Sequence, residues 1–278
     1  MARPSATDLK QAAVSSEARA ARGDGRLVIS DVAHDYVTKK ERVQALDPIE
    51  LTIEPGEFVS LAGPSGCGKS TLLSLLAGFI FPTQGEITLG GRRITKPDWE
   101  RGVVFQQPNL YPWLSVRDNV TFGPRMRGLP KSDYEERAEE FLRLVSLHDF
   151  AGRRPYELSG GMQQRAAIAR VLVNDPAIML MDEPFGALDA LTRERMQEEL
   201  LAIWRETDKT IFFITHSVEE AVYLGSRVLV MTPRPGSIVF DEATPFSKMG
   251  TSVHEARLMP EFADMERRVA EAIYAGHR

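Results

Sequence analysis

The sequence predicts an α/β protein with a mainly parallel core sheet, an antiparallel β subdomain near the N-terminus and an inserted helical subdomain. Two observations support this class. A glycine-rich loop joins an apolar, strand-like stretch at 57–62 to a helix-forming stretch at 71–77. Strand-like and helix-like stretches then alternate from 178 to 231, as in parallel sheets covered by helices. With 278 residues, the chain is long enough to bury a substantial core.

Composition narrows the possible classes of function. The net charge of −5 gives no broad basic surface, so we expect no nucleic-acid partner. The single cysteine excludes an intramolecular disulfide and fits a reducing compartment. No stretch approaches the roughly 20 apolar residues of a membrane span. Residues 1–25 lack the apolar core of a secretory signal and predict a disordered tail, with an amphipathic surface anchor as the alternative.

The N-terminal part of the chain predicts short β-strands joined by turns. Strand-like runs occupy 27–32 and 44–53, with a charged turn at 39–42 between them. A Pro-Gly pair at 55–56 breaks the second run before the strand at 57–62. Further strands are expected at 85–91 and 101–105.

The glycine-rich loop has the spacing G-x-x-x-x-G-K-S of a phosphate-binding P-loop. Its glycines allow backbone N–H groups to approach phosphate oxygens, and the following helix adds the positive end of its dipole. Lys69 can reach the β- and γ-phosphates, and the Ser70 hydroxyl can hold Mg²⁺. The motif therefore predicts ATP and Mg²⁺ as cofactors, against the alternative of a glycine turn that only links two elements. The expected nucleotide-binding residues are Gly63, Pro64, Ser65, Gly66, Cys67, Gly68, Lys69, Ser70 and Thr71.

Cys67 lies inside this loop, and two opposing effects bear on its reactivity. The start of a helix and Lys69 favour the reactive thiolate, whereas burial under the loop opposes it. We expect a maleimide to modify Cys67 and to block ATP binding, with the balance of the two effects left open.

The segment at about 107–174 predicts helices. Ser132 and Glu135 have the spacing of a capping box, and apolar residues then recur at helical spacing at Ala138, Phe141, Leu142 and Val145. A second helix is expected to start just after Ser159.

A strand at 178–181 leads into two carboxylates, Asp182 and Glu183. Parallel strands deliver such residues to the sheet edge that binds ligand, so Asp182 is expected to hold Mg²⁺ and Glu183 to act as general base. A strand that merely ends in acidic loop residues is the alternative. Further elements are expected at 191–206 (helix), 210–215 (strand), 218–224 (helix), 227–231 (strand) and 262–274 (helix). His216 directly follows the strand at 210–215.

Leu158-Ser159-Gly160-Gly161-Met162-Gln163-Gln164-Arg165 resembles the signature motif of ATP-binding-cassette (ABC) ATPases, with Met162 where the best-known form has Gln. Further features match that family in order, from about 27 to 241: Tyr36 resembles its adenine-stacking aromatic, Gln106 its glutamine loop, Gly186-Ala187-Leu188-Asp189 its dimer-contact loop and His216 its histidine switch. The resemblance implies a P-loop NTPase (ABC ATPase) domain at 26–245, a helical subdomain at about 107–174 within it, and a C-terminal helical extension at 246–278.

The resemblance also implies how the site works. Two chains would form a head-to-tail homodimer in which Ser159, Gly160, Gly161 and Asp189 face the partner's nucleotide. Gln106, Glu183 and His216 would be catalytic, with Gln106 also a metal ligand beside Ser70 and Asp182. Adenine would stack on Tyr36, for which simple packing is the alternative.

Short sequence segments at 162–165, 196–200, 215–222 and 234–236 narrow the resemblance to the nitrate/sulfonate/taurine importer ATPases. This implies a bacterial ATPase on the cytoplasmic face of the inner membrane that drives separate permease subunits, served by a periplasmic solute-binding protein. The apolar stretch at 109–116 suits a permease interface or, alternatively, a packed loop. A soluble ABC ATPase acting on DNA or ribosomes is the alternative function, although no long coiled coil or second cassette is present. A P-loop kinase of small molecules would leave the signature motif unexplained. Nothing in the chain identifies the cargo.

Overall fold

The computed structural model describes residues 25–37 and 41–276, so the predicted disordered tail lies, but for its last residue, outside the described residues. A six-stranded sheet forms the centre of the described chain, in the order β10-β9-β3-β8-β7-β6. Only β10 is antiparallel to its neighbour, which confirms the predicted mainly parallel sheet. Its strands are β3 (Phe58–Ala62), β6 (Arg101–Val104), β7 (Ile178–Asp182), β8 (Thr210–Thr215), β9 (Arg227–Met231) and β10 (Ile238–Ala243).

The expected antiparallel β region is a four-stranded sheet in the order β2-β1-β4-β5. Its strands are β1 (Leu27–Val37), β2 (Arg42–Ile53), β4 (Gln84–Leu89) and β5 (Arg92–Arg93). β1 runs five residues beyond its predicted end because register shifts in its pairing with β2 let the strand bend and continue through Tyr36.

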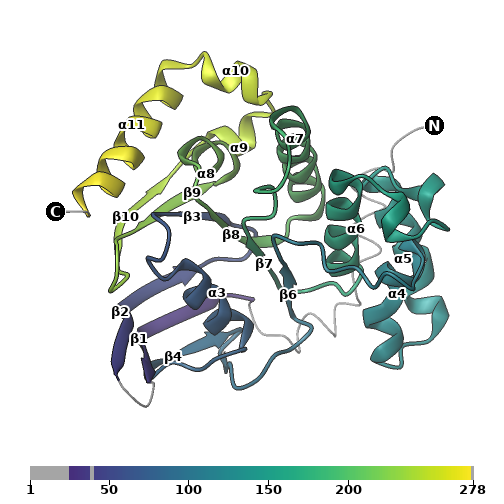
Figure 1. The fold of residues 1–278 in the computed structure, drawn as a ribbon, viewed down its shortest axis with the longest axis horizontal. Coiled ribbons are helices and arrows are strands. Elements are labelled where there is room, and N and C mark those ends of the chain that lie inside the picture. The colour runs from purple at the N-terminus through teal and green to yellow at the C-terminus, as the bar shows by residue number, and fades with distance from the viewer. Residues whose placement is uncertain (1–24, 38–40, 277–278) are drawn as a thin grey trace.

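Two apolar cores lie on opposite faces of the six-stranded sheet. One packs helix α3 (Lys69–Ala77) between this sheet and the antiparallel sheet, with Leu72 and Leu76 fully buried. The other lies beneath α7 (Ala190–Thr207) and α8 (Val218–Leu224), two helices on the opposite face of the sheet (Figure 1). Because β3, β7, β8 and β9 are buried from both faces, they are largely apolar in sequence.

Helices α4 (Val116–Met126), α5 (Lys131–Leu144) and α6 (Gly160–Leu172) lie together on one side of the molecule (Figure 1), accompanied by short 3-10 turns at His148–Phe150 and Pro155–Glu157. The predicted apolar stripe of α5 is buried. The predicted capping box is wrong. The N-cap of α5 is Pro130, which places Ser132 inside the first turn. The fixed φ of proline suits the start of a helix, so the helix begins before the serine.

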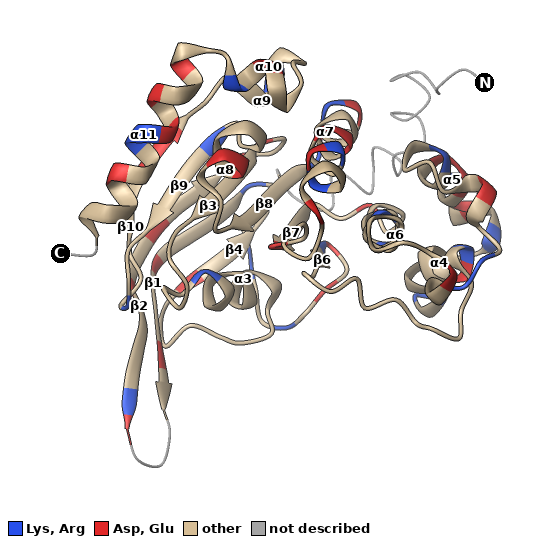
Figure 2. Ribbon diagram, turned by 45° about the horizontal axis from the view of Figure 1, so that its top comes forward, with Lys and Arg blue, Asp and Glu red and all other residues tan. Residues whose placement is uncertain are grey.

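The C-terminal part folds back over α8 and the β9–β10 edge. It contains α9 (Phe246–Met249), α10 (Val253–Arg257) and α11 (Pro260–Ala275) (Figure 1). Phe262, Met265 and Val269 bury one side of α11. Acidic and basic residues are mixed along α4, α5, α7 and α11 (Figure 2). Within the described ranges, no helix combines the length and the apolar character needed to cross a bilayer.

Candidate functional site

Three neighbouring parallel strands bring the predicted site residues to one edge of the sheet. β3, β8 and β7 are paired so that Ala62 lies opposite Thr215 and Asp182 opposite Ile214. The glycine-rich loop leaves β3 here, the two carboxylates end β7, and His216 follows β8. The carboxyl ends of parallel strands are where such sheets bind ligands.

The glycine-rich loop fits tightly between its neighbours. A Cβ at Gly63 would lie 2.7 Å from the Met231 carbonyl oxygen. Gly68 has a φ of +113°, and a Cβ there would lie 2.6 Å from Leu46 Cδ2. Gly63 therefore requires glycine because there is no space for a side chain. Gly68 requires it for lack of space and for its left-handed backbone conformation.

Lys69 lies inside the loop that surrounds it. Its side chain is 5% exposed, and Nζ donates hydrogen bonds to the carbonyl oxygens of Gly63 (2.7 Å) and Pro64 (3.0 Å). Among the residues that the structure describes, this ammonium group contacts those oxygens and the Cys67 sulfur rather than a carboxylate. A buried cation with no carboxylate in direct contact is costly. The arrangement therefore fits an anionic ligand such as the phosphates of ATP.

Ser70 and Asp182 form the candidate metal site. Ser70 Oγ donates to Asp182 Oδ1 at 3.3 Å. Burial raises the pKa of Asp182 and the nearby Glu183 charge adds to this, while the Ser70 hydrogen bond and Lys69 oppose it. A hydroxyl and a carboxylate suit Mg²⁺, which binds few protein oxygens and completes its shell with phosphates and water. The described residues contain no group of three or more His, Cys, Asp or Glu side chains that could hold a metal ion.

Glu183 and His216 meet beside this metal site. His216 Nδ1 lies 3.2 Å from Glu183 Oε2, and the side chains are 60% and 28% exposed. Glu183 has a φ of +44°, in the left-handed region, and its N–H donates to the Ile214 carbonyl oxygen at 3.0 Å. A non-glycine residue in this conformation at a sheet edge is a feature of functional sites.

Gln106 lies two residues beyond the end of β6 and is exposed. A Cβ at Gly186 would lie 3.0 Å from its side-chain nitrogen, so the predicted dimer-contact turn packs against Gln106. At the end of that turn, Asp189 is the N-cap of α7 and accepts from the Thr192 N–H at 3.0 Å. Hydrogen bonds from Thr192 lower the pKa of Asp189.

The predicted signature turn lies beside the dimer-contact turn. Ser159 is the N-cap of α6, and its Oγ accepts from the Met162 N–H at 3.3 Å. A Cβ at Gly160 would lie 3.6 Å from Leu188, and one at Gly161 would lie 2.9 Å from Thr192. Ser159 and Gly160 are exposed, so the free N–H groups of α6 face outwards.

Tyr36 is exposed beside the loop, whereas Cys67 is buried within it. The Tyr36 ring is 43% exposed, its hydroxyl lies 3.2 Å from Thr71 Oγ1, and it packs edge-on against His34. Cys67 is 1% exposed, with Sγ 3.8 Å from Lys69 Nζ. Of the two effects weighed from the sequence for Cys67, the structure therefore shows strong burial.

Two residues that sequence reasoning did not assign to the site hold the segment around Gln106. Gln164, buried in α6, donates to the Phe105 carbonyl oxygen at 3.3 Å. Arg170 donates to the carbonyl oxygens of Pro108 (2.8 Å) and Asn109 (2.7 Å). Their position on the signature helix was the only sequence signal, because their carbonyl partners leave no side-chain pattern.

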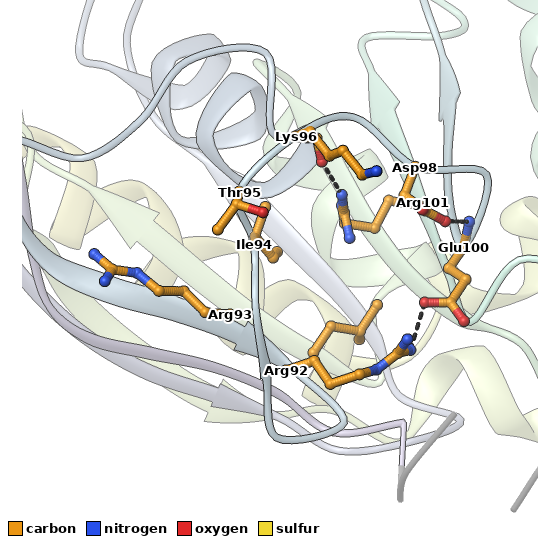
Figure 3. A pocket seen from close by; sticks show the side chains of 9 residues that line it. Arg92, Arg93, Ile94, Thr95, Lys96, Asp98, Glu100 and Arg101 are labelled. Carbon is orange, nitrogen blue, oxygen red and sulfur yellow. Dashed lines mark hydrogen bonds and ion pairs between the residues drawn. The ribbon is translucent and has the colours of Figure 1, made fainter. Parts of the chain in front are cut away.

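A polar cavity of about 190 Å³ lies elsewhere, at the start of β6 and so at the opposite end of this strand from Gln106. Arg92 pairs with Glu100 at 2.6 Å, and Arg101 donates to the Lys96 carbonyl oxygen; dashed lines mark both interactions in Figure 3. None of the predicted site residues lines this cavity.

Comparisons with known proteins agree with this geometry. A model of the ABC transporter family matches residues 46–186. The taurine import ATP-binding protein TauB of Roseobacter denitrificans is 53% identical over 236 residues, which cover 84% of this chain and 88% of the relative. An uncharacterized ABC transporter ATP-binding protein, MJ0412 of Methanocaldococcus jannaschii, is 52% identical over 213 residues, covering 77% and 80%.

Solved structures give the same assignment. The dimeric ATP-binding cassette MJ0796, in a post-hydrolysis state bound to ADP and Pi, is 34% identical with a TM-score of 0.68, covering 79% of this chain and 99% of that one. The cbiO1 protein of Clostridium perfringens, part of an ABC transporter complex, is 26% identical with a TM-score of 0.71, covering 90% and 97%. The chain thus belongs to the ABC transporter family, as one of its ATP-binding, ATP-hydrolysing subunits.

Proposed function

We propose that this chain is the motor subunit of a bacterial importer, hydrolysing ATP at the cytoplasmic face of the inner membrane to drive uptake through separate permease subunits. The proposed cargo is a small solute of the taurine, sulfonate or nitrate type, delivered by a periplasmic binding protein. The names of the relatives support this cargo, since several are taurine import ATP-binding proteins. No nucleic-acid partner is included in the proposal.

The observation that carries the proposed activity is the cluster of Lys69, Ser70, Asp182, Glu183 and His216 at one sheet edge. The loop N–H groups and Lys69 bind the phosphates, and Ser70 and Asp182 hold Mg²⁺, which neutralises phosphate charge when bound. Glu183 accepts a proton from water as the water oxygen bonds to the γ-phosphorus. The bond between that phosphorus and the β–γ bridging oxygen breaks, which leaves ADP and inorganic phosphate.

Gln106 and His216 complete the proposed reaction site. His216 contacts Glu183, which supports the proposal that it holds the attacking water and the γ-phosphate. Gln106 packs on Gly186, and its amide oxygen would be a further ligand for the metal. The proposed place for adenine is the exposed ring of Tyr36, which lies beside Thr71 at the end of the loop.

We further propose that the active form is a head-to-tail homodimer in which the turn at Ser159, Gly160 and Gly161, together with Asp189, faces the partner's nucleotide. These two turns lie side by side and are largely exposed. Ser159 caps only the Met162 N–H, so the preceding N–H groups at the start of α6 provide positive potential for a phosphate. The dimeric state named for the ADP- and Pi-bound cassette supports this arrangement.

The proposed domain limits are 26–245 for the ATPase domain, about 107–174 for its helical subdomain and 246–278 for the C-terminal extension.

We propose that the permease docks on exposed aromatic side chains of the helical subdomain and of the rest of the ATPase domain. Trp113 is 68% exposed, Phe81 is 51% exposed and Phe79 is 48% exposed. Exposed aromatic residues of this kind are enriched in protein interfaces.

The test is Glu183→Gln. Since Ser70, Asp182 and Lys69 are untouched, ATP binding should persist while steady-state hydrolysis is lost, and the variant should accumulate as an ATP-dependent dimer in size-exclusion chromatography. Glu136→Gln, which changes an exposed acid on α5, is the matched control. Near-normal turnover by the Glu183 variant would refute the assigned role.

A second experiment addresses the cargo. In the bacterium that carries the gene, deletion should abolish uptake of labelled taurine, and the wild-type gene but not the Glu183→Gln gene should restore it. Uptake of labelled nitrate, measured in parallel, separates the two cargo types. Unchanged uptake of both solutes after deletion would exclude taurine and nitrate as the cargo.

A further inference from the structure

A buried carboxyl group lies directly behind the His216 turn. Glu220, on α8, is 6% exposed. One carboxyl oxygen accepts from the Thr215 hydroxyl, and the other accepts from Gln197 Nε2 at 3.0 Å. Burial raises the pKa of Glu220, as expected for a carboxyl group far from water. Such a group is costly to bury, so its two hydrogen bonds specify where it sits.

The hydrogen bonds of Glu220 fix both sides of His216. Thr215, just before the histidine, donates its hydroxyl to Glu220 and accepts from the Ser217 N–H at 3.0 Å. Ser217, just after it, accepts from the Glu220 N–H at 3.3 Å. The backbone that carries His216 is therefore held from behind, while its ring faces Glu183.

The same network reaches the turn that ends at Asp189. Gln197 lies on α7, the helix that Asp189 caps. One turn earlier on this helix, Arg193 donates to the carbonyl oxygens of Leu188 (2.9 Å) and Phe185 (3.4 Å). Positions four apart lie on one helix face. A single face of α7 thus holds the dimer-contact turn through Arg193 and the His216 turn through Gln197 and Glu220.

We propose that Glu220 is a positioning residue for ATP hydrolysis, which joins the His216 turn to α7 through Gln197 so that the His216 and Asp189 turns keep a fixed relative position. The proposal rests on the proposed role of His216. Glu220 acts through its hydrogen bonds and touches neither nucleotide nor water. Because small misplacement of a reacting geometry costs rate while leaving binding intact, the effect should appear in kcat.

The experiment compares four variants by kcat, KM for ATP and thermal unfolding, at slightly alkaline pH. Glu220→Ala should lower kcat on the order of tenfold to a hundredfold with KM little changed. Glu220→Gln should keep most activity. The Gln197 side-chain oxygen is buried and has no hydrogen-bond partner in the wild type. If the Gln197 amide turns over, this oxygen can accept a hydrogen bond from the amide nitrogen of the new glutamine. Gln197→Glu should lose activity, since it places two carboxylates together in the interior.

The fourth variant exchanges the two residues, Gln197→Glu with Glu220→Gln. In this variant the amide at position 220 again faces a carboxylate, now at position 197, so that one group donates and the other accepts. Its kcat should therefore be higher than that of Gln197→Glu alone. This swap conserves volume and keeps the test decisive even if Glu220→Ala unfolds. Wild-type kcat in Glu220→Ala, a loss confined to KM, or a stably folded swap without recovered kcat would each overturn the proposal.

The link to Asp189 has its own measurement. In the Glu183→Gln background, Glu220→Ala should weaken ATP-dependent dimer formation, and unchanged dimer formation would overturn the link. Failure of the proposed function can be told apart from failure of this inference, because it would already appear in the two parent proteins. Either the wild type would not hydrolyse ATP, or Glu183→Gln would turn over ATP normally.

Discussion

His216 Nδ1 and Glu183 Oε2 lie 3.2 Å apart, although the two residues are 33 positions apart in the chain. Their strands, β8 and β7, are parallel neighbours, and the N–H of Glu183 bonds back to the Ile214 carbonyl oxygen of β8. The backbone bond and the side-chain contact together fix where the proposed general base stands. Two residues in hydrogen-bond contact are expected to act as a unit, so their variants should not have additive effects.

Replacement of His216 should act on rate and not on binding. We expect His216→Ala to lower kcat by about a hundredfold, with KM for ATP little changed because Lys69 and Ser70 still bind the nucleotide. Steady-state ATPase assays measure both constants. His254→Ala, at an exposed position on α10, is the matched control and should behave as wild type. A loss in KM alone would contradict the placement of His216 at the reacting atoms.

Ser159→Arg should leave nucleotide binding by a single chain intact but prevent the hydrolysis that requires a dimer. The bulky cation would block the approach of α6 to the partner's nucleotide, so we expect nearly normal ATP affinity of the monomer in titration calorimetry but no ATPase activity. Ser252→Arg also removes a helix N-cap, that of α10, and controls for loss of the cap. If monomer affinity falls as far as activity does, the turn serves the nucleotide of its own chain instead.

Asp182 should make the nucleotide-free protein less stable as pH rises. Burial raises the folded-state pKa of Asp182, so between its two pKa values the unfolded chain binds fewer protons and the free energy of unfolding falls with increasing pH. The loss begins near the unfolded value of about 4 and is complete above the folded pKa. Asp182→Asn should therefore show a smaller fall in melting temperature than wild type between about pH 4.5 and about pH 8. Parallel melting curves for the two proteins over this range would rule out the effect.

Maleimide labelling of Cys67 should be slow in the folded protein. The thiol is 1% exposed, and a Cβ at Gly63 would lie 3.1 Å from its sulfur, so reagent can reach it only when the loop opens. Mg-ATP should slow labelling further because it binds the same loop. Intact-mass spectrometry of native and denatured protein, with Cys67→Ser as the unreactive control, measures the rates. Equal rates with and without saturating Mg-ATP would show that ligand binding does not restrict this opening.

The sequence alone predicted the elements whose signals are local. The strand at 210–215 and the helix at 218–224 have the bounds of β8 and α8. The glycine-rich loop could be recognised in the sequence because its structure requires glycine at fixed positions. Only glycine fits the left-handed backbone at Gly68 and the close approach of Gly63 to Met231. The Asp182-Glu183 pair could likewise be found at the end of a purely apolar strand.

Two other features were missed or misplaced because their local signals were weak or competed with one another. β10 was not predicted, because an edge strand of alternating half-buried and exposed residues has no apolar run to mark it. The start of α5 was misplaced because Pro130 began the helix ahead of a plausible serine cap. In both places a local pattern was too weak or was overridden by the adjoining chain.

The sequence therefore determined the family, the strand–loop–helix motif and the residue types available for chemistry, since each follows from short-range spacing. Only the tertiary structure decided which of these residues meet. The order β3-β8-β7 brings His216 to Glu183, and the packing of α7 on α8 brings Gln197 to Glu220. Strand order and helix packing are set by burial of whole apolar faces, which is a property of the assembled core and not of any single stretch of sequence.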